Sequence, residues 1–380
     1  MNQGGLKVLM LSSDRNILLP GSLVAERMRD YGNLVEALHI VLLCDRSHSL
    51  KETVLASNVF VYPTNSLASI FRPLDAARLG KKLILEKKFV RGKSVITADS
   101  IECGWAGVRI KRKWRLPLEV QLHTDPFSPY FSGFQNAVRK FFAGSVLRNA
   151  DRVRVVSEAL KAQVSRITQA EVEVLPIYVD KQKIEDAPIS FDVHARYPWH
   201  FIILAVSRLA PEKNLGLAIQ VLSLVRQKFP DVGMLIVGSG PEEKSLKSKV
   251  KSLKLEGAVE FAGWQNSLSS YYKTANLFIQ TSLFEGYGLS LVEAGLSGMP
   301  IVTTDVGIAQ ELEHGKDLYK YSPNDPQSFA DGIVGLIENN FKRENLKINI
   351  RRALESRLLS KEEYLKRLAG NWESAAAKIR

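Results

Sequence analysis

Two glutamates in a glycine-rich segment are the first feature of this sequence that could do chemistry. Glu285 leads the turn Gly286–Tyr287–Gly288, and Glu293 follows eight residues after Glu285 in an apolar run. Glycines let the backbone approach a ligand closely and turn its amide groups outward. A helix is expected directly after the turn. Its first amides attract a phosphate, and a carboxylate near them suits ribose hydroxyls.

A second interpretation of the same segment is a helix cap followed by a structural glutamate. Glu293 lies among apolar residues, and an unpaired carboxylate is costly to bury. This cost favours a functional or paired role for Glu293. The segment therefore predicts a loop that binds phosphate, ribose and sugar together.

Three further segments place polar or aromatic residues after expected strands. "VSRLAPEKNL" carries Arg208 at a strand end and Lys213 beside a helix start, where two cations and helix amides could clamp a diphosphate. Taken alone, the same pair fits surface cations in a loop. "VGSGPE" has Glu243 where a dinucleotide-binding motif has its third glycine, so it is a weak signal. "FAGW" places Trp264 either beside a base or in a packing contact.

The elements that must position these residues are two series of alternating strands and helices. Short apolar runs such as "KVLMLSS" and "LEVQLH" in the first half, and "FIILAVS" and "LFIQTS" in the second, precede helical patterns. This alternation predicts parallel sheets with crossover helices. It stops near Asp180 and restarts near Trp199. We therefore expect an α/β fold of two Rossmann-like, doubly wound domains that face a central cleft, with ligands at the carboxyl ends of the strands.

Length and composition limit the protein class. A chain of 380 residues suits two domains, and it has no run of about 18 apolar residues that would predict a spanning helix. The start, "MNQGGLKVLMLSSD", lacks the basic region of a signal peptide. Cys44 and Cys103 lie far apart, and the histidines show no metal-ligand spacing. We expect a reduced, cytoplasmic setting and no metal site.

Positive charge is concentrated in the first half. The net charge is +12, and residues 1–180 hold 26 Lys and Arg against 17 Asp and Glu. Two clusters dominate, Arg72–Lys93 and Arg109–Arg115, and "VRKFFAGSVL" adds further cations beside phenylalanines. A basic half implies an anionic partner: a membrane surface, nucleic acid or a phosphorylated substrate. The mixture of cations with large apolar residues favours an anionic membrane, no nucleic-acid module accompanies the charge, and the alternative is a solvated face.

The motifs together resemble a known enzyme family. "SRLAPEKN", "VGSGPE", "FAGW" and "EGYGLSLVEAGLSGMPIV" in the second half, with "VQLHTD" and "VVSEALK" in the first, resemble the retaining glycosyltransferases of family four. That family has the GT-B fold and a Glu-x7-Glu signature, which Glu285 and Glu293 match. The resemblance implies an N-terminal acceptor-side domain at 1–183, a linker at 184–198, a nucleotide-sugar-binding domain at 199–360 and a C-terminal helix at 361–380 that returns to the first domain.

The resemblance also implies site residues. It assigns to catalysis His123, Arg208, Lys213 and Glu285, and to donor binding Gly21, Trp264, Gly286, Tyr287, Gly288 and Glu293. Arg208 and Lys213 would hold the diphosphate. Glu293 would bind the ribose, and Glu285 with the glycine backbone would meet the transferred sugar.

Three assignments concern the edges of this site. Trp264 would lie beside the base through its backbone, and His123 would contact the sugar from the opposite domain. Gly21, in the loop Pro20–Gly21–Ser22, would approach the phosphates and the acceptor, although relatives commonly have two glycines there. "TTDVGIAQEL" also departs from the family, because many relatives have two adjacent glycines where Gly307–Ile308 stand. No direct role is assigned to that loop.

The function that the resemblance implies is a retaining, metal-independent glycosyl transfer without a cofactor. The donor would be a nucleoside-diphosphate sugar, with a UDP-sugar favoured over a GDP-sugar, and a hexosyl or N-acetylhexosaminyl group would be moved. The acceptor would be a glycan or lipid-linked molecule of cell-envelope polysaccharide synthesis, at the inner face of the membrane, with no nucleic acid involved. Retention by a carboxylate nucleophile such as Glu285 and same-face displacement both fit the residues; the resemblance favours the latter.

Two other function classes remain open from the sequence. A nicotinamide-dependent oxidoreductase is disfavoured by the broken glycine motif and by the lack of a suitably placed acidic residue. A catalytically silent nucleotide-sugar-binding or membrane-associated partner protein is disfavoured by the presence of Arg208, Lys213, Glu285 and Glu293.

Overall fold

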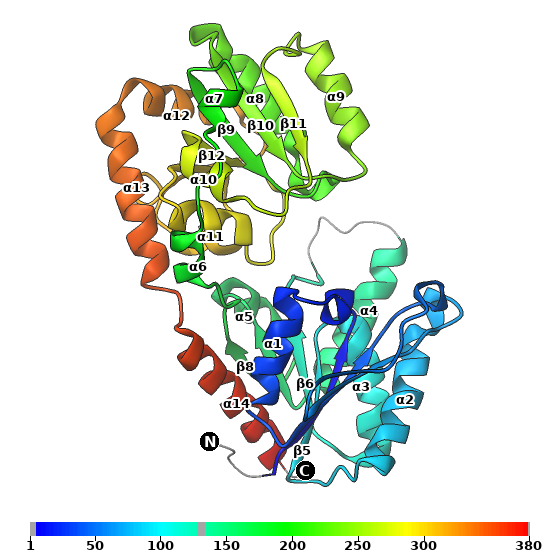
Figure 1. Cartoon of the computed structure of the whole chain (residues 1–380). Helices are drawn as coiled ribbons and strands as arrows, with labels where there is room; N and C mark the ends of the chain where they lie inside the picture. Colours follow the sequence, from blue (N-terminus) through cyan, green and yellow to red (C-terminus); the bar gives the residue numbers. More distant parts are fainter. Residues whose placement is uncertain (1–4, 128–133, 379–380) are drawn as a thin grey trace. The chain divides into compact units, whose positions relative to one another are not determined.

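The computed structural model describes residues 5–127 and 134–378 (Figure 1). The chain divides into two compact units, which we call unit 1 (Met1–Tyr178 with Leu359–Arg380) and unit 2 (Val179–Leu358). Each unit is a predominantly parallel sheet covered by helices. The prediction of two Rossmann-like α/β domains is therefore confirmed.

Unit 1 contains an eight-stranded sheet in the order β3-β4-β2-β1-β5-β6-β7-β8. Every pair is parallel except β3 with β4. The chain moves from β1 in one direction to β2 and later in the other direction to β5, so the strand order reverses beside β1. The strands are β1 Lys7–Ser12, β2 Ala37–Leu42, β3 Thr53–Ala56, β4 Val59–Pro63, β5 Ser94–Ala98, β6 Leu118–Leu122, β7 Arg152–Val155 and β8 Glu171–Val174.

Helices cover both faces of this sheet. Helix α3 packs against α2 and α4 on one face, while α14 crosses the other face over β5 and β6 (Figure 1). Successive side chains of a strand point to opposite faces of the sheet, so each strand offers apolar side chains to the helices on both faces. Val8 and Met10 of β1 share a core with α14, while a methyl at Gly107 of α3 would lie 3.6 Å from Leu11. The helices are α1 Leu23–Gly32, α2 Arg72–Glu86, α3 Ile101–Trp114, α4 Phe134–Asn149, α5 Glu158–Val164 and α14 Lys361–Ala377, with short 3-10 turns η1 Arg15–Leu18, η2 Arg46–His48 and η3 Ser69–Phe71.

The C-terminal helix belongs to unit 1, as the sequence predicts. Trp372 of α14 is fully buried, with its ring edge-on to Tyr31 at 5.7 Å between centroids. The Tyr31 and Tyr364 hydroxyls lie 2.9 Å apart, and Arg152 Nε donates to Asn371 Oδ1 at 3.1 Å. Apolar packing and buried hydrogen bonds therefore hold a segment more than 180 residues distant in sequence from the rest of the unit.

Unit 2 contains a six-stranded parallel sheet in the order β11-β10-β9-β12-β13-β14. The strand order reverses between β9 and β12. The strands are β9 Phe201–Val206, β10 Val232–Val237, β11 Val259–Gly263, β12 Leu277–Gln280, β13 Ile301–Thr304 and β14 Tyr319–Tyr321. The helices are α8 Leu215–Lys228, α9 Glu243–Ser252, α10 Ser269–Thr274, α11 Leu289–Leu296, α12 Pro326–Glu338 and α13 Asn340–Glu355, with 3-10 turns η4 Pro211–Lys213 and η5 Gly307–Glu311.

The segment expected to be a linker carries local structure. Helix α6 Lys181–Asp186 overlaps its start, and α7 Val193–Arg196 lies within it. The backbone amides of Ser190 and Val193 donate to Ser270 Oγ at 2.8 Å and to Thr274 Oγ1 at 3.1 Å. Val193 is buried, so this segment packs against unit 2 and belongs to it.

Candidate functional site

A lysine–glutamate pair lies at the carboxyl edge of the unit 2 sheet, where the strand order reverses. Lys213 ends η4 after β9, and Glu285 follows β12. Lys213 Nζ donates to Glu285 Oε1 at 2.7 Å, and the two side chains are only 18% and 10% exposed. Ser282 Oγ donates to the same oxygen, also at 2.7 Å. Two donors thus fix one oxygen of the Glu285 carboxylate, and the sequence did not predict either contact.

The loop after β12 is bound to the loop after β9. Thr281 Oγ1 donates to the carbonyls of Lys213 and Asn214 at 3.1 and 3.0 Å, and the amide of Leu283 donates to the carbonyl of Glu212 at 2.8 Å. These contacts set where Lys213 lies relative to Glu285. Sequence reasoning missed Thr281 and Ser282 as site residues. The available signal was that both are polar residues directly after a buried strand.

The glycine turn is supported by a second loop. Gly288 has a φ of 95° and directly precedes α11, so it starts the helix from a left-handed conformation. The amide of Ile308 donates to the carbonyl of Tyr287 at 2.7 Å. Gly307 has a φ of 59°, and a methyl group there would lie 2.5 Å from the Tyr287 carbonyl oxygen. The loop of Gly307 and Ile308, to which the sequence analysis assigned no role, therefore supports the glycine turn through the Tyr287 carbonyl.

Glu293 projects from the second turn of α11 toward α10. The hydroxyl of Tyr272 donates to Glu293 Oε2 at 3.1 Å, and Tyr272 itself is buried. Burial raises the pKa of Glu293, and the hydrogen bond from Tyr272 opposes this rise. Glu293 therefore has one hydrogen-bond partner, whereas its apolar sequence context left a functional and a paired role both open. Tyr272 was missed, because a tyrosine in a short helical pattern is typical of a core residue.

Arg208 and Trp264 lie at the same edge but do not join the lysine–glutamate pair. Arg208 follows β9 and forms a salt bridge with Glu212 of its own loop. Trp264 follows β11, and its side chain is 72% exposed. The structure thus brings Lys213 and Glu285 into direct contact and leaves Arg208 and Trp264 on the surface of unit 2.

The glycines of "VGSGPE" have a packing explanation. Gly238 and Gly240 follow β10, and a methyl group on them would lie 1.9 Å from the Ser207 carbonyl oxygen and 2.3 Å from that of Leu209. The amide of Leu209 donates to the Ser239 carbonyl at 2.9 Å. These glycines therefore let the β10 loop support the loop that carries Arg208.

The remaining two candidates belong to unit 1. His123 directly follows β6 and is exposed at the carboxyl edge of that sheet. Gly21 has a φ of 71° and precedes Ser22, whose Oγ caps α1 by accepting from the amide of Ala25 at 3.0 Å. Open space surrounds the position of a Gly21 side chain, so its backbone conformation, not crowding, requires glycine.

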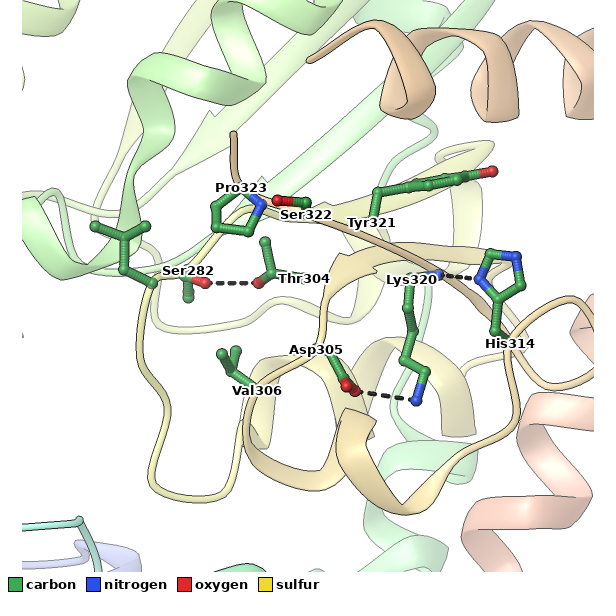
Figure 2. A pocket seen from close by; sticks show the side chains of 10 residues that line it. Ser282, Thr304, Asp305, Val306, His314, Lys320, Tyr321, Ser322 and Pro323 are labelled. Carbon is green, nitrogen blue, oxygen red and sulfur yellow. Dashed lines mark hydrogen bonds and ion pairs between the residues drawn. The ribbon is translucent and has the colours of Figure 1, made fainter. Parts of the chain in front are cut away.

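A cavity of about 370 Å³ adjoins the pair on the side of β13 and β14. Figure 2 shows Lys320 reaching toward Asp305, with 3.0 Å between Nζ and Oδ1, while the ring of His314 accepts from the Lys320 amide at 3.0 Å. Thr304 Oγ1 donates to the carbonyl of Ser282 at 2.6 Å. Since Ser282 lines this cavity and also donates to Glu285, the cavity adjoins the candidate site, and the sequence did not predict it.

Two further observations concern the chain outside this site. Among residues 5–127 and 134–378, no group of three or more His, Cys, Asp or Glu side chains could hold a metal ion. No helix in the described part of the chain has both the length and the apolar character that a membrane crossing requires.

Comparison with known proteins identifies the family. The profile of the glycosyl transferases group 1 matches residues 186–353, and that of the glycosyl transferase 4-like domain matches residues 38–177. The chain belongs to the GT4-type glycosyltransferases. The resemblance seen in the sequence is therefore confirmed, and the two matches fall on unit 2 and unit 1 respectively.

Individual relatives agree with this family. The chain is 30% identical over 173 residues to an uncharacterized glycosyltransferase of Haemophilus influenzae, covering 45% of this chain and 47% of that one. It is 28% identical over 197 residues to a poly(ribitol-phosphate) α-N-acetylglucosaminyltransferase of Staphylococcus aureus, covering 51% and 39%. The chain thus spans less than half the length of these two relatives.

A solved structure shows that the fold is GT-B. The crystal structure of Anabaena HepE in complex with UDP and glucose superimposes with a TM-score of 0.77 over 97% of this chain and 100% of that chain, at 21% identity. At this identity the likeness concerns the fold, which two Rossmann-like domains define.

Proposed function

We propose that the protein transfers a hexosyl or N-acetylhexosaminyl group from a nucleoside-diphosphate sugar with retention of configuration and without a metal ion. The observation that carries this proposal is the Lys213–Glu285 pair, placed beside the glycine turn at the carboxyl edge of the unit 2 sheet. Ligands of doubly wound sheets bind at this edge, next to the reversal of strand order.

Lys213 is proposed to stabilise the leaving diphosphate. Negative charge builds on the diphosphate as its bond to the sugar breaks, and preorganised cations and amides lower the free energy of that transition state. The Lys213 ammonium is already fixed by Glu285, and the amides around Gly288 open α11 beside it. Arg208 would add a second cation by leaving Glu212, its partner in the same loop.

Glu285 is proposed to bind sugar hydroxyls and not to attack the anomeric carbon. Its Oε1 accepts hydrogen bonds from Lys213 and Ser282, which lower the nucleophilicity of the carboxylate and leave Oε2 for a hydroxyl. Retention would then come from same-face displacement. The bond from the anomeric carbon to the diphosphate oxygen breaks, the bond to the acceptor oxygen forms, and the acceptor proton passes to the leaving diphosphate.

The remaining residues are proposed to complete the donor site. Glu293 would bind the ribose hydroxyls through its carboxylate, which Tyr272 holds by one oxygen. Trp264 would lie beside the base, and His123 and Gly21 of unit 1 would contact the sugar and the phosphates.

A UDP-sugar and a cell-envelope acceptor are the substrates that the relatives favour. HepE binds UDP and glucose, and the Staphylococcus aureus relative acts on poly(ribitol-phosphate), a polyanionic polymer. We propose a glycan or lipid-linked acceptor, with the reaction at the cytoplasmic face of the membrane. No cofactor is needed for this chemistry.

A donor screen tests the proposal. The protein is incubated with UDP-glucose, UDP-N-acetylglucosamine and GDP-mannose, and free nucleoside diphosphate is measured by mass spectrometry. We expect slow hydrolysis of one UDP-sugar and a rise of the thermal midpoint with UDP, since ligand binding to the native state stabilises it. Stabilisation by UDP without any hydrolysis or transfer would favour the catalytically silent alternative, and stabilisation by NAD alone would contradict the proposal.

A further inference from the structure

The basic clusters of the sequence meet at one edge of unit 1. Helices α2 and α3 both run from the carboxyl edge of the sheet back to its amino edge, because each leads into the next parallel strand. They pack closely: a methyl group on Gly80 of α2 would lie 2.6 Å from Ile110 of α3. Their C-terminal ends lie together near the starts of β5 and β6 (Figure 1). We call residues 81–93 and 111–115 the amino-edge patch.

The amino-edge patch carries a large excess of positive charge. Its two segments hold ten Lys and Arg residues and one acidic residue, Glu86. Lys7 of β1 lies beside it, since Lys7 Nζ donates to the Lys87 carbonyl at 2.9 Å, but the Lys7 charge is paired with Glu36 at 3.5 Å. Part of the charge is paired, by Lys82 with Glu86 at 3.7 Å and by Lys111 with Asp151 at 2.5 Å. The exposed cations of the patch include Lys87, Lys88, Lys93, Arg112, Lys113 and Arg115.

Exposed apolar side chains lie among these cations. Leu85 is 62% exposed and Val90 is 57% exposed, and both have lysines on either side within three residues. Trp114, at the end of α3, is partly exposed. Cations at helix C-terminal ends are stabilised by the helix dipole, which explains part of the charge. The dipole does not explain exposed aliphatic side chains, nor the cations of the loop 87–93.

We propose that the amino-edge patch is the surface through which unit 1 binds an anionic bilayer. Lysines and arginines meet the lipid phosphates, and Leu85 and Val90 enter the interface between headgroups and acyl chains. A soluble polyanion would match the charge but would leave the two aliphatic side chains in water, so the bilayer is the favoured partner. This interface is independent of the donor site, and the two can fail separately.

Vesicle flotation tests the proposal on the full chain. Vesicles of phosphatidylglycerol with phosphatidylcholine are compared with pure phosphatidylcholine, at about 0.05 M and about 0.5 M NaCl, because salt screens the attraction. The test variant combines Lys87→Glu with Arg112→Glu, one from each segment. The matched control combines Lys244→Glu with Lys251→Glu, which makes the same change of net charge at exposed positions of α9 in unit 2. Thermal midpoints and UDP binding report on folding and on the donor site.

We expect capture of the wild-type protein by anionic vesicles at low salt only. The patch variant should lose at least about 30-fold in partitioning, since each basic residue near the surface contributes about a fivefold factor. The α9 control should bind like the wild type.

A second comparison tests the apolar contribution. Leu85→Ser with Val90→Ser should lower partitioning about tenfold, because the two side chains no longer enter the interface. Leu67→Ser with Ile70→Ser, which are exposed positions just before α2, should change nothing. Absence of capture at low salt, equal capture by neutral vesicles, or equal losses in the patch and α9 variants would overturn the proposal. Loss of partitioning only in the charge variant would also overturn it in favour of a polyanion surface.

Discussion

At the scale of single residues, the candidate site contains two carboxylates, each with one oxygen that accepts hydrogen bonds from neighbouring side chains. Glu285 has Oε1 bound by Lys213 and Ser282, and Glu293 has Oε2 bound by Tyr272. Each carboxylate is therefore fixed in orientation and still offers acceptor capacity to a hydroxyl. This arrangement suits a substrate rich in hydroxyl groups, because each carboxylate is already oriented and can still accept a hydrogen bond from a hydroxyl.

Replacing the lysine of the pair tests its role at the diphosphate. Lys213→Ala should lower turnover by roughly 10²–10³-fold, the range for losing one preorganised electrostatic group. Because the change also leaves Glu285 without its ammonium partner, folding is checked by circular dichroism and thermal midpoint. Ser282→Ala is the comparison, since it removes the other donor to Glu285 Oε1 without removing the cation, and we expect a loss of about tenfold or less. Full activity in a folded Lys213→Ala protein would refute the donor-site assignment.

The two glutamates should separate by ligand. Glu293→Gln should weaken binding of free UDP, because ribose belongs to the nucleotide, whereas Glu285→Gln should leave UDP binding unchanged and depress sugar transfer. Calorimetry with UDP alone, followed by turnover measurements, checks both. Equal losses of UDP binding in the two variants, or no loss in either, would show that the proposed division of roles is wrong.

The raised pKa of Glu293 predicts a pH-dependent stability difference. Burial raises this pKa above its ordinary value of 4.5, so Glu293 binds a proton more tightly in the native state than in the unfolded chain. The corresponding stability is present below pH 4.5 and is lost as pH rises through the raised pKa. The glutamine in Glu293→Gln does not titrate. The thermal midpoint of this variant should therefore rise relative to that of the wild type as pH increases above 4.5. A midpoint difference independent of pH would mean that the carboxyl is not desolvated. The variant is thus expected to be more stable at neutral pH while binding UDP less well.

At the scale of elements, the sequence predicted the alternation of strands and helices but not the contacts between loops. Strand and helix patterns are local, since they depend on apolar spacing within one segment. Thr281 and Gly307 act through contacts with loops that follow other strands. Tyr272 reaches Glu293 from a six-residue helix. Such contacts depend on which loops the sheet order brings together, and that order is not legible in any one segment.

Gly307 allows the support of the glycine turn to be tested. Gly307→Ala should destabilise unit 2 by about 1–3 kcal/mol through its positive φ, and more because the new methyl would meet the Tyr287 carbonyl at 2.5 Å. The matched control is Gly315→Ala, which has a φ of 80° and open space around its side-chain position. Thermal unfolding compares their stabilities, and UDP-sugar hydrolysis reports on the turn. If the two variants lose equal stability and Gly307→Ala keeps full hydrolysis, the η5 loop does not support the site.

At the scale of the whole molecule, the chain returns to its first unit through one helix. The sequence predicted this return from the family resemblance, and α14 packs with the core of unit 1. What the sequence did not show is the network that receives it. Arg152 and Arg154 are buried on β7, and nothing in the sequence of that strand indicates that its arginines bind a helix from the far end of the chain.

Trp372 is the residue through which this return is best tested. Its side chain is fully buried against Tyr31, so Trp372→Ala should lower the free energy of unfolding of unit 1 by about 3–5 kcal/mol through lost burial and the cavity left behind. The matched control is Trp264→Ala, because Trp264 is 72% exposed and its removal should change stability by about 0.5 kcal/mol or less. Denaturant unfolding followed by circular dichroism measures both, and UDP binding reports on unit 2.

Because α14 belongs to unit 1 and the nucleotide is proposed to bind unit 2, Trp372→Ala should shift an early unfolding transition, and UDP binding should persist through that transition. Trp264→Ala should leave the unfolding curve unchanged. An unchanged unfolding curve for Trp372→Ala would mean that α14 contributes no stability to the unit that its contacts place it in.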